Sequence, residues 1–471
     1  MSVTRRNVLL GAAGSVVVLS GAKCSRAQPT KQPNIVFIMA DDLGYADVSC
    51  YGRREYRTPS IDRIATEGMR FLQGYANSAV CSASRTALIT GRYQDRLAIG
   101  LEEPLARRDD GKMPGLPPEL PTLPAQLKNG GYATALVGKW HLGALPDFGP
   151  EKSGYDHFYG IRGGSSDYFI HDKNLWSQDE LVDEHGYLTD LLGDHAVQYI
   201  RGQAGQRKPF FLSLHFNAPH WPWEGPGDEA EAKRIQGGLK DFDGGSMKTY
   251  GEMVTRMDYQ IGRVLAALDE AGAANDTIVV FTSDNGGERY SDHWPFTGMK
   301  LELLEGGLRI PVVVRWPARV PAGVTNADQP MIHMDWMPTF LAAARITADP
   351  SFPTDGMNLL PTLTANASPV PRTLFWRYLN LLQEACREGD WKYLKILDNT
   401  FLFNVVEDPL ERANYKDRRP ELYERLVAKY EAWAATMLPL DPGAFTDGNI
   451  GRELPDHYGS TKLKNLGDWR D

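Results

Sequence analysis

Four apolar runs that end in polar residues constrain the fold of this chain more than any other feature. They read NIVFIMADD, YATALVGKWHLG, PFFLSLHFNAPHWP and DTIVVFTSDNGG. Nearly continuous apolar runs such as Ile35 to Met39 are typical of strands buried on both faces. Amphipathic stretches separate them, and we expect helices at residues 58–71, capped by Ser60, and at 249–272, stopped by Gly272. This alternation predicts an α/β fold with a mostly parallel sheet sandwiched by helices.

The pattern of apolar and polar residues changes near residue 370. RTLFWRYL, EACREGDWKYLKIL and TFLFNVVEDP are typical of short antiparallel strands, and an amphipathic helix, PELYERLVAKYEAWAATML, follows them. A chain of 471 residues, 42% of them hydrophobic, has material for two domains. We therefore expect a main domain at residues 32–370 and a smaller C-terminal α+β subdomain at residues 371–471.

The N-terminus has the pattern of an export signal. Arg5 and Arg6 precede an apolar run from Val8 to Leu19, and small residues follow. The pattern indicates a twin-arginine signal peptide at residues 1–27 and a periplasmic or secreted protein. The run is shorter than the about 20 apolar residues of a membrane span, and an uncleaved anchor is the alternative. No other segment has this character, so we expect no stable membrane span.

The net charge restricts the classes of partner. A formal net charge of −9 disfavours binding to nucleic acid, which usually brings a basic excess. An anionic substrate is still compatible with this charge, because a local cluster of Arg, Lys and His can override the global sign.

Acidic and amide side chains follow two of the four apolar runs. Asp41 and Asp42 come directly after the first run, and Asp284 and Asn285 come directly after the last. In open α/β sheets, ligands bind beyond the carboxyl ends of the strands. Converging oxygen donors there suit a hard divalent cation such as Ca²⁺ or Mg²⁺. The alternative is that each pair only begins a turn.

Five basic side chains are candidates for one anion pocket: Arg85, Lys139, His141, His220 and Lys300. Together they would neutralise a bound oxyanion and protonate a leaving group. Lys139 and His141 lie two residues apart on an extended segment, which places both side chains on the same side of the chain. Taken singly, each of the five also fits a surface or capping residue.

The cysteines argue against a disulfide framework. Four occur, Cys24 lies in the signal region, and an odd number is left for the mature chain. Cys50 and Cys386 are either a pair or two free thiols. Cys81 comes just before a helical pattern in AVCSASRTALITG, where amide N–H groups and the helix dipole favour an anion. A reactive thiolate and an inert thiol both fit this position, but no Cys–His–Asn pattern of the cysteine proteases accompanies it.

Six motifs occur in a fixed order: ADDLGYAD, CSASR with TGRY, GKWHLG, APHWP, SDNGG and EGGLRIP. In these motifs and their spacing the chain resembles, from about residue 33 to at least 410, the type I sulfatases of the alkaline-phosphatase-like superfamily. The resemblance implies the alkaline-phosphatase-like fold, hydrolysis of sulfate esters and a catalytic domain at residues 32–370.

In that family the signature cysteine, here Cys81, is oxidised after translation to formylglycine (3-oxoalanine). One hydroxyl of the hydrated aldehyde attacks sulfur as the alcohol leaves, and collapse of the diol then expels sulfate. The resemblance also implies one bound Ca²⁺, with Mg²⁺ as the alternative ion. Its ligands would be Asp41, Asp42, Asp284, Asn285 and the modified residue 81.

The resemblance assigns a role to each basic residue. Arg85 would hold the modified side chain, and Lys139 and Lys300 would contact sulfate oxygens. His220, with Lys300, would assist the leaving oxygen. His141 would help the diol to lose its proton.

Two further positions follow from the resemblance. Ser165 or Ser166 in GGSSDYF would contribute to the site. The third signature position is Ala83, where many members carry Pro. Oxygen-dependent formylglycine-forming enzymes prefer Pro and anaerobic radical enzymes accept Ala, so the identity of the modifying enzyme stays open.

Export, and a C-terminal region similar to the tails of bacterial sulfatases, some related to N-acetylgalactosamine-6-sulfatases, favour a sulfated polysaccharide or its fragments as substrate. Four aromatic residues near the expected site either stack on sugar rings or pack loops: Tyr168, Trp176, Trp221 and Trp223. One alternative is a phosphonate monoester or phosphodiester hydrolase of the same superfamily, whose members tend to place His where this chain has Asn285. The other is an inactive binder of sulfated glycan, which the complete set of motif residues disfavours.

Overall fold

The structure, a computed structural model, describes residues 31–108, 111, 114–235, 245–365 and 367–444. The predicted signal peptide and the last part of the predicted C-terminal subdomain lie outside these residues. The chain divides into two compact units, Met1–Lys31 and Gln32–Asp471, and the strands and helices of the described residues belong to the second. Within the described residues, no helix combines the length and apolarity that a membrane span needs.

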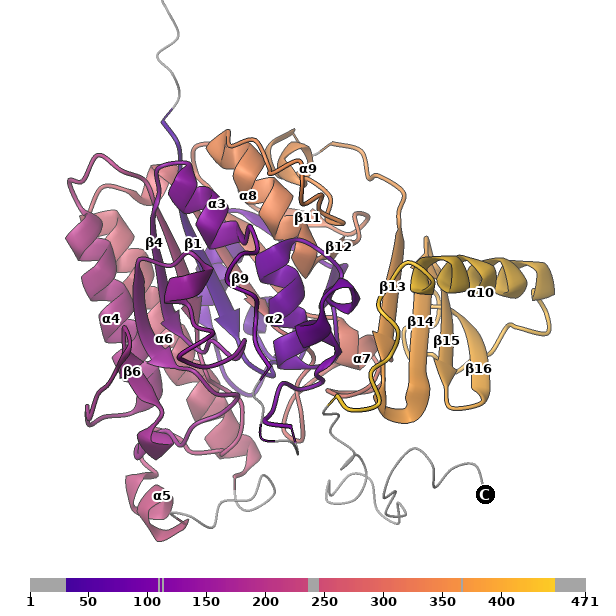
Figure 1. The fold of residues 1–471 in the computed structure, drawn as a ribbon, viewed down its shortest axis with the longest axis horizontal. Coiled ribbons are helices and arrows are strands. Elements are labelled where there is room, and N and C mark those ends of the chain that lie inside the picture. The colour runs from indigo at the N-terminus through magenta and orange to yellow at the C-terminus, as the bar shows by residue number, and fades with distance from the viewer. Residues whose placement is uncertain (1–30, 109–110, 112–113, 236–244, 366, 445–471) are drawn as a thin grey trace, which may run out of the picture. The chain divides into compact units, whose positions relative to one another are not determined.

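Within the described part of the chain, ten strands form a mixed sheet in the order β11-β2-β10-β9-β1-β8-β4-β5-β6-β7 (Figure 1). The middle strands run parallel and are β9 (Thr277–Ser283), β1 (Asn34–Ala40), β8 (Phe210–His215), β4 (Ala133–Gly138) and β5 (His157–Ile161). The outer strands are β10 (Val312–Arg315), β2 (Met69–Phe71), β11 (Val324–Asn326), β6 (Leu175–Ser177) and β7 (Glu180–Leu181). A short parallel pair joins β12 (Met331–Ile332) to β3 (Gly74–Tyr75). The predicted α/β fold is confirmed.

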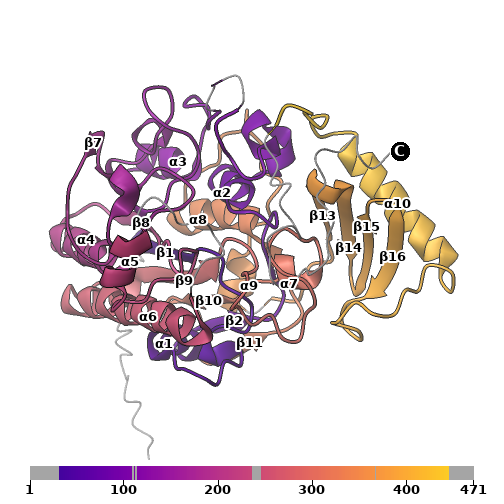
Figure 2. The same ribbon diagram turned by 90° about the horizontal axis from the view of Figure 1, so that it is seen from below.

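Helices cover both faces of the sheet, as Figure 2 shows. One face carries α1 (Pro59–Thr66), α4 (Leu188–Gln203) and α6 (Met247–Glu270). The other carries α2 (Cys81–Thr90), α3 (Leu123–Asn129), α8 (Trp336–Ala344) and α9 (Leu360–Ala365). Val36 and Ile38 pack on the first face and Ile35 and Phe37 on the second. Because successive strand residues point to opposite faces, burial on both sides explains the nearly continuous apolar run.

The prediction of a helix over residues 58–71 is wrong in two details. The helix α1 ends at Thr66, and Met69–Phe71 form β2 against β10, because Gly68 lets the chain pass close to the backbone of Val314. Ser60 is not the cap. The carboxylate of Asp258 on α6 accepts hydrogen bonds from the N–H groups of Ser60 (3.1 Å) and Ile61 (2.9 Å).

The other long helix agrees with its prediction. The helix α6 ends at Glu270, and Gly272 follows in the left-handed region with φ 63°. Two short helices, α5 (Glu229–Ile235) and α7 (Glu305–Leu308), lie in connecting segments.

The C-terminal residues form the small antiparallel sheet and helix that the sequence predicts (Figure 1). Residues 373–404 make a four-stranded sheet of β13 (Thr373–Tyr378), β14 (Gln383–Glu388), β15 (Trp391–Ile396) and β16 (Asn399–Asn404), followed by α10 (Pro420–Ala434). The indole N–H of Trp376 donates to the carbonyl of Ala76 at 2.8 Å, so this sheet contacts the segment that leads to Cys81. The domain boundary at residue 370 stays a prediction.

A buried ion cluster also joins this sheet to the EGGLRIP segment. The ammonium of Lys392 lies 3.0 Å from a carboxylate oxygen of Glu305 and 2.9 Å from one of Glu411, and all three side chains are fully buried. Replacing Lys392 with Met keeps most of the volume but leaves two carboxylates facing each other. We expect Lys392→Met to lower the free energy of unfolding by about 3–5 kcal/mol, measured by urea denaturation.

Lys395→Met on the same strand is the matched control. The ammonium of Lys395 lies 3.0 Å from Glu384, but its side chain is 30% exposed. Exposed pairs contribute little, so we expect a loss below about 1 kcal/mol. Equal losses in the two variants would contradict the assignment of stability to the buried cluster.

Candidate active site

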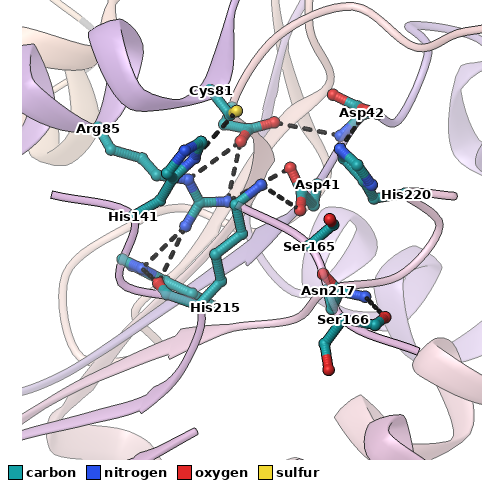
Figure 3. A network of polar contacts seen from close by, with 12 residues as sticks. Asp41, Asp42, Cys81, Arg85, His141, Ser165, Ser166, His215, Asn217 and His220 are labelled. Atoms are coloured by element: carbon teal, nitrogen blue, oxygen red, sulfur yellow. Dashed lines mark hydrogen bonds and ion pairs between the residues drawn. The ribbon is translucent and has the colours of Figure 1, made fainter. Parts of the chain in front are cut away.

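The polar ends of four parallel strands meet at one edge of the sheet. Two residues follow β1 (Asp41 and Asp42), two follow β9 (Asp284 and Asn285), two follow β4 (Lys139 and His141) and one lies beyond β8 (His220). The helix α2 contributes Cys81 and Arg85, and the segment after β9 contributes Lys300. All of these side chains are buried. The structure brings together every residue of the predicted metal and anion sites. Figure 3 shows Asp41, Asp42, Cys81, Arg85, His141 and His220 of this set.

Cys81 lies at the start of α2. The helix begins at Cys81 itself, one residue earlier than the sequence pattern indicates, and Arg85 follows one turn later. The hydroxyl of Ser84 accepts from the N–H of Ser78 (3.0 Å) and donates to its carbonyl (2.9 Å), which fixes the segment entering the helix. Residue 81 is therefore held at the positive end of a buried helix.

Each of the three carboxylates pairs with a different basic side chain. The ammonium of Lys139 lies 2.6 Å from Asp41, and that of Lys300 lies 2.7 Å from Asp42. Arg85 donates from Nε (3.1 Å) and Nη2 (2.8 Å) to the same oxygen of Asp284. Although burial disfavours its ionisation, Arg85 and Lys139 hold the pKa of Asp284 well below its usual range. Burial raises the pKa of Asp41 well above its usual range, despite the opposing charge of Lys139.

His141 faces Cys81. Its Nδ1 lies 3.2 Å from the sulfur, while Nε2 lies 3.1 Å from the carbonyl of Leu105. A carbonyl only accepts hydrogen bonds, so Nε2 carries the proton and Nδ1 presents a lone pair to residue 81. Burial, followed by the charges of Lys139 and Arg85, lowers the pKa of His141 well below its usual value and keeps the ring neutral.

His220 and Lys300 form a second pair above Asp42. The Nδ1 of His220 lies 2.6 Å from the carbonyl of Trp221, so this nitrogen carries the proton. Nε2 lies 3.4 Å from the ammonium of Lys300 and 3.4 Å from a carboxylate oxygen of Asp42. Burial, followed by the charge of Lys300, lowers the pKa of His220 well below its usual value. Asp42 and Glu288 raise the pKa of Lys300 well above its usual value against the effect of burial.

Two residues of the site have left-handed backbone conformations. Asp42 has φ 61° and His141 has φ 56°, values that non-glycine residues adopt only at a cost. Each lies just past the end of a central strand. From these positions the side chain of Asp42 contacts Lys300 and that of His141 contacts Cys81.

The oxygens at this edge fit a hard cation. Single ligand atoms of Asp41, Cys81 and Asp284 lie within 4.8 Å of one another, as do those of Asp41, Asp42 and His220. One side-chain oxygen of Asp41 and one of Asn285 are buried and have no hydrogen-bond partner in the described structure. Buried oxygens are seldom left unpaired. The unpaired carboxylate oxygen of Asp41 and the unpaired amide oxygen of Asn285 lie beside the carboxylates of Asp42 and Asp284. Together these oxygens form a donor set suited to Ca²⁺ or Mg²⁺.

The remaining predicted positions have mixed outcomes. Ser165 and Ser166 lie near Asn217 and the sheet edge, where the amide of Asn217 donates to the carbonyl of Ser166 at 3.3 Å (Figure 3). Cys50 and Cys386 are free thiols, so the pairing alternative is wrong.

Of the four aromatic residues, two are buried and two are half-buried. Tyr168 is fully buried, and its hydroxyl contacts the carbonyls of Asn217 and His220, which makes it a packing residue. Trp223 is also buried. Trp221 is half-buried with its ring beside His220 (4.7 Å between centroids), and Trp176 is half-buried under the guanidinium of Arg162.

Three residues that contact the site were not predicted from the sequence. Glu288 lies 3.2 Å from the ammonium of Lys300, Asn217 lies between Ser166 and the His220 segment, and His215 contacts Arg85. His215 and Asn217 stand at the end of the apolar run PFFLSLHFNAPHWP, so the strand-end rule could have found them. Glu288 has no such signal, because a loop brings it to Lys300.

Comparisons with known proteins agree with this geometry. Residues 33–346 match the model of the Sulfatase family. The rat N-acetylgalactosamine-6-sulfatase is 33% identical, over 80% of this chain and 74% of its own length. Mouse arylsulfatase J is 29% identical, over 87% of this chain and 77% of its own length.

Solved structures give the same result. The structure described as Ps i-CgsB in complex with k-i-k-neocarrahexaose has a TM-score of 0.79 and 32% identity, and the match covers 90% of this chain and 97% of that one. A phosphonate monoester hydrolase of Agrobacterium radiobacter shares the fold with a TM-score of 0.60 at 20% identity. The chain therefore belongs to the sulfatase family, whose members hydrolyse sulfate esters.

Proposed function

We propose that this sulfatase removes sulfate from an extracellular sulfated carbohydrate with an aldehyde made from Cys81 and one bound Ca²⁺. The observation that carries the proposal is the position of Cys81. It lies at the start of α2, with ligand atoms of Asp41 and Asp284 within 4.8 Å and His141 at 3.2 Å. A thiol in this position stands where the hydrated aldehyde of formylglycine would stand.

The residues that would hold Ca²⁺ are Asp41, Asp42, Asp284, Asn285 and the modified residue 81. Mg²⁺ is the alternative, although it demands a more regular octahedral shell. When bound, the ion would supply positive charge that stabilises negative charge developing on nearby oxygens. Arg85 donates a hydrogen bond to Asp284 and lies 3.6 Å from a carboxylate oxygen of Asp41. The guanidinium therefore orients both carboxylates.

When present, the hydrated aldehyde supplies one hydroxyl as the nucleophile and a second whose deprotonation expels sulfate. His141 is the group that accepts this second proton, because its Nδ1 lone pair faces residue 81 and its Nε2 is fixed by Leu105. Its low pKa keeps Nδ1 free to accept near neutral pH.

The two lysines would bind the sulfate oxygens. Both ammonium groups are buried and already positioned by Asp41 and Asp42. At the leaving oxygen, His220 and Lys300 would act together, because Nε2 of His220 and the ammonium of Lys300 lie 3.4 Å apart. Such preorganised donors stabilise the charge that develops in the transition state.

The substrate class is proposed from the relatives. One is named for N-acetylgalactosamine 6-sulfate, and another was solved with a neocarrahexaose. The twin-arginine pattern of residues 1–27 supports a periplasmic or secreted location, where sulfated polysaccharides are encountered. A formylglycine-forming enzyme is the required partner, and Ala83 at the third signature position leaves its type open.

Hydrolysis of an aryl sulfate and of an aryl phosphodiester tests the proposal against its closest alternative. We expect kcat/KM for 4-nitrophenyl sulfate to exceed that for bis(4-nitrophenyl) phosphate by at least about 100-fold, a difference of roughly 3 kcal/mol in transition-state binding. The reverse order would favour a phosphodiester hydrolase. Binding of a sulfated glycan with no turnover of either ester would favour an inactive binder.

A further inference from the structure

Lys300 contacts two acidic side chains, and the proposed mechanism uses one of them. Its ammonium lies 2.7 Å from a carboxylate oxygen of Asp42 and 3.2 Å from one of Glu288. Lys139, the other lysine of the site, forms an ion pair with Asp41 and with no second acid among the described residues. The contact with Glu288 therefore distinguishes Lys300 from Lys139.

The backbone places Glu288 beside Lys300. The carbonyl of Gly287 accepts a hydrogen bond from the N–H of Lys300 at 3.0 Å, and the N–H of Ser291 donates to the carbonyl of Glu288 at 2.8 Å. A Cβ at Gly287 would lie 2.7 Å from the carbonyl oxygen of Asp42, so this turn also passes close to the backbone of the metal site. The loop from Gly287 to Lys300 thus closes on itself next to Asp42.

The two acids differ in exposure and in role. The side chain of Asp42 is 2% exposed, whereas that of Glu288 is 15% exposed. Asp42 is a ligand of Ca²⁺ in the proposed function, so its negative charge is shared between the cation and the ammonium. Glu288 belongs to neither group of potential metal ligands in the described residues. Its carboxylate therefore stays available to Lys300 when a dication, which repels the ammonium, occupies the site.

The proposed role of Lys300 requires such an anchor. Nε2 of His220 lies 3.4 Å from the ammonium of Lys300 and 3.4 Å from an oxygen of Asp42, and Figure 3 shows the last two residues side by side. When the bond between sulfur and the bridging oxygen breaks, the electron pair stays on that oxygen. A nearby positive charge stabilises it if the charge is preorganised there. A displacement of about 1 Å can cost about 100-fold in rate.

We propose that Glu288 is a positioning residue for ester cleavage: it holds the ammonium of Lys300 at the leaving oxygen while Asp42 binds the metal. The inference rests on the proposed function, in which Lys300 and His220 act together at that oxygen. Glu288 acts through Lys300 and is not itself a catalytic residue. Its contribution is largest for esters whose leaving group is a strong base, and the alcohols of the proposed carbohydrate substrate belong to this class.

Two aryl sulfates with different leaving groups test the inference. Phenolate is as basic as a tyrosine side chain, with a pKa of about 10, whereas 4-nitrophenolate is a much weaker base and leaves with less assistance. Glu288→Gln keeps the size of the side chain and removes its charge. We expect this variant to lower kcat/KM for phenyl sulfate by about 10–100-fold and that for 4-nitrophenyl sulfate by less than about threefold.

Two further measurements separate this role from damage to the metal site or the fold. Loss of a group that orients metal ligands typically costs about 10–100-fold in metal affinity. Because Glu288 acts on Lys300, we expect the Ca²⁺ affinity of Glu288→Gln, measured by calorimetry on chelator-treated protein, to change by less than about threefold. Thermal unfolding verifies that the variant is folded.

Asp292→Asn is the matched control. Asp292 lies on the same loop and loses the same charge, but its ion pair is with Arg53 at 3.9 Å and its side chain is 38% exposed. The ratio of the two kcat/KM values should stay at its wild-type value in this variant.

Equal losses on the two esters in Glu288→Gln, or no loss on phenyl sulfate, would overturn the inference. The same change of ratio in Asp292→Asn would overturn it as well, because a charge effect without contact would then explain the result. A tenfold loss of Ca²⁺ affinity in Glu288→Gln would move the role of Glu288 to the metal site. Failure of the proposed function is a different result, because the wild-type protein itself would then hydrolyse neither aryl sulfate.

Discussion

Replacing Cys81 with alanine is expected to abolish sulfate ester hydrolysis and to leave the fold intact. The side chain of residue 81 lies at the start of α2, beside Asp41, Asp284 and the lone pair of His141. Alanine cannot be oxidised to the aldehyde, so the nucleophile is lost. We expect kcat to fall by at least about 10⁴-fold, as it does when a covalent nucleophile is removed. The measurement is turnover of 4-nitrophenyl sulfate, with circular dichroism to verify folding.

Cys386→Ala is the matched control for this variant. Cys386 is also a fully buried free cysteine, but it lies on β14 of the C-terminal sheet. Its removal should leave kcat unchanged and cost some stability, as a buried side chain is shortened. A Cys81→Ala protein that keeps measurable fractions of wild-type kcat would refute the nucleophile assignment.

Removal of divalent cations is expected to abolish activity, and Ca²⁺ is expected to restore it. Asp41, Asp42 and Asp284 are buried within one cluster, and one oxygen of Asp41 and one of Asn285 have no hydrogen-bond partner in the described structure, although Arg85 lies 3.6 Å from that oxygen of Asp41. A bound dication supplies several kcal/mol of charge stabilisation in such a site, so chelation with EGTA should reduce kcat by at least about 10³-fold. Added Ca²⁺ should also raise the melting temperature of chelated protein, because it binds only the native state.

The identity of the restoring ion completes this test. Zinc prefers several nitrogen and sulfur ligands in tetrahedral sites, whereas carboxylate oxygens outnumber the sulfur of Cys81 and the nitrogen of His220 in the ligand groups of this site. We therefore expect Ca²⁺ to restore more activity than Zn²⁺ at equal concentration. An enzyme whose turnover survives exhaustive chelation would contradict the assignment of the acids to a metal.

The position of the site could be predicted from the sequence because it follows from strand ends alone. Buried parallel strands are continuous apolar runs, and their carboxyl ends share an edge, so the residues after Ala40 and Ser283 had to converge. Arg85 and Lys300 lie outside those strands. As basic residues they were candidates for the same pocket, and the resemblance to a family gave them their roles.

Details that depend on tertiary contacts could not be predicted. Ser60 fits a local capping pattern, but Asp258, distant in the sequence, satisfies the helix N-terminus instead. Met69–Phe71 continue an amphipathic pattern, but pairing with β10 makes them a strand. The contact between His215 and Arg85 depends on the register of β8 with β4, and a linear pattern does not encode register.

The most direct test of the proposed mechanism is the chemical state of residue 81 in the native, active enzyme. Peptide mass analysis, combined with labelling by an aldehyde-specific hydrazide, measures the fraction of chains that carry formylglycine. We predict that this fraction is substantial and that kcat rises in proportion to it across preparations made with and without a formylglycine-forming enzyme. A fully active preparation in which residue 81 is entirely an unmodified thiol would contradict the mechanism.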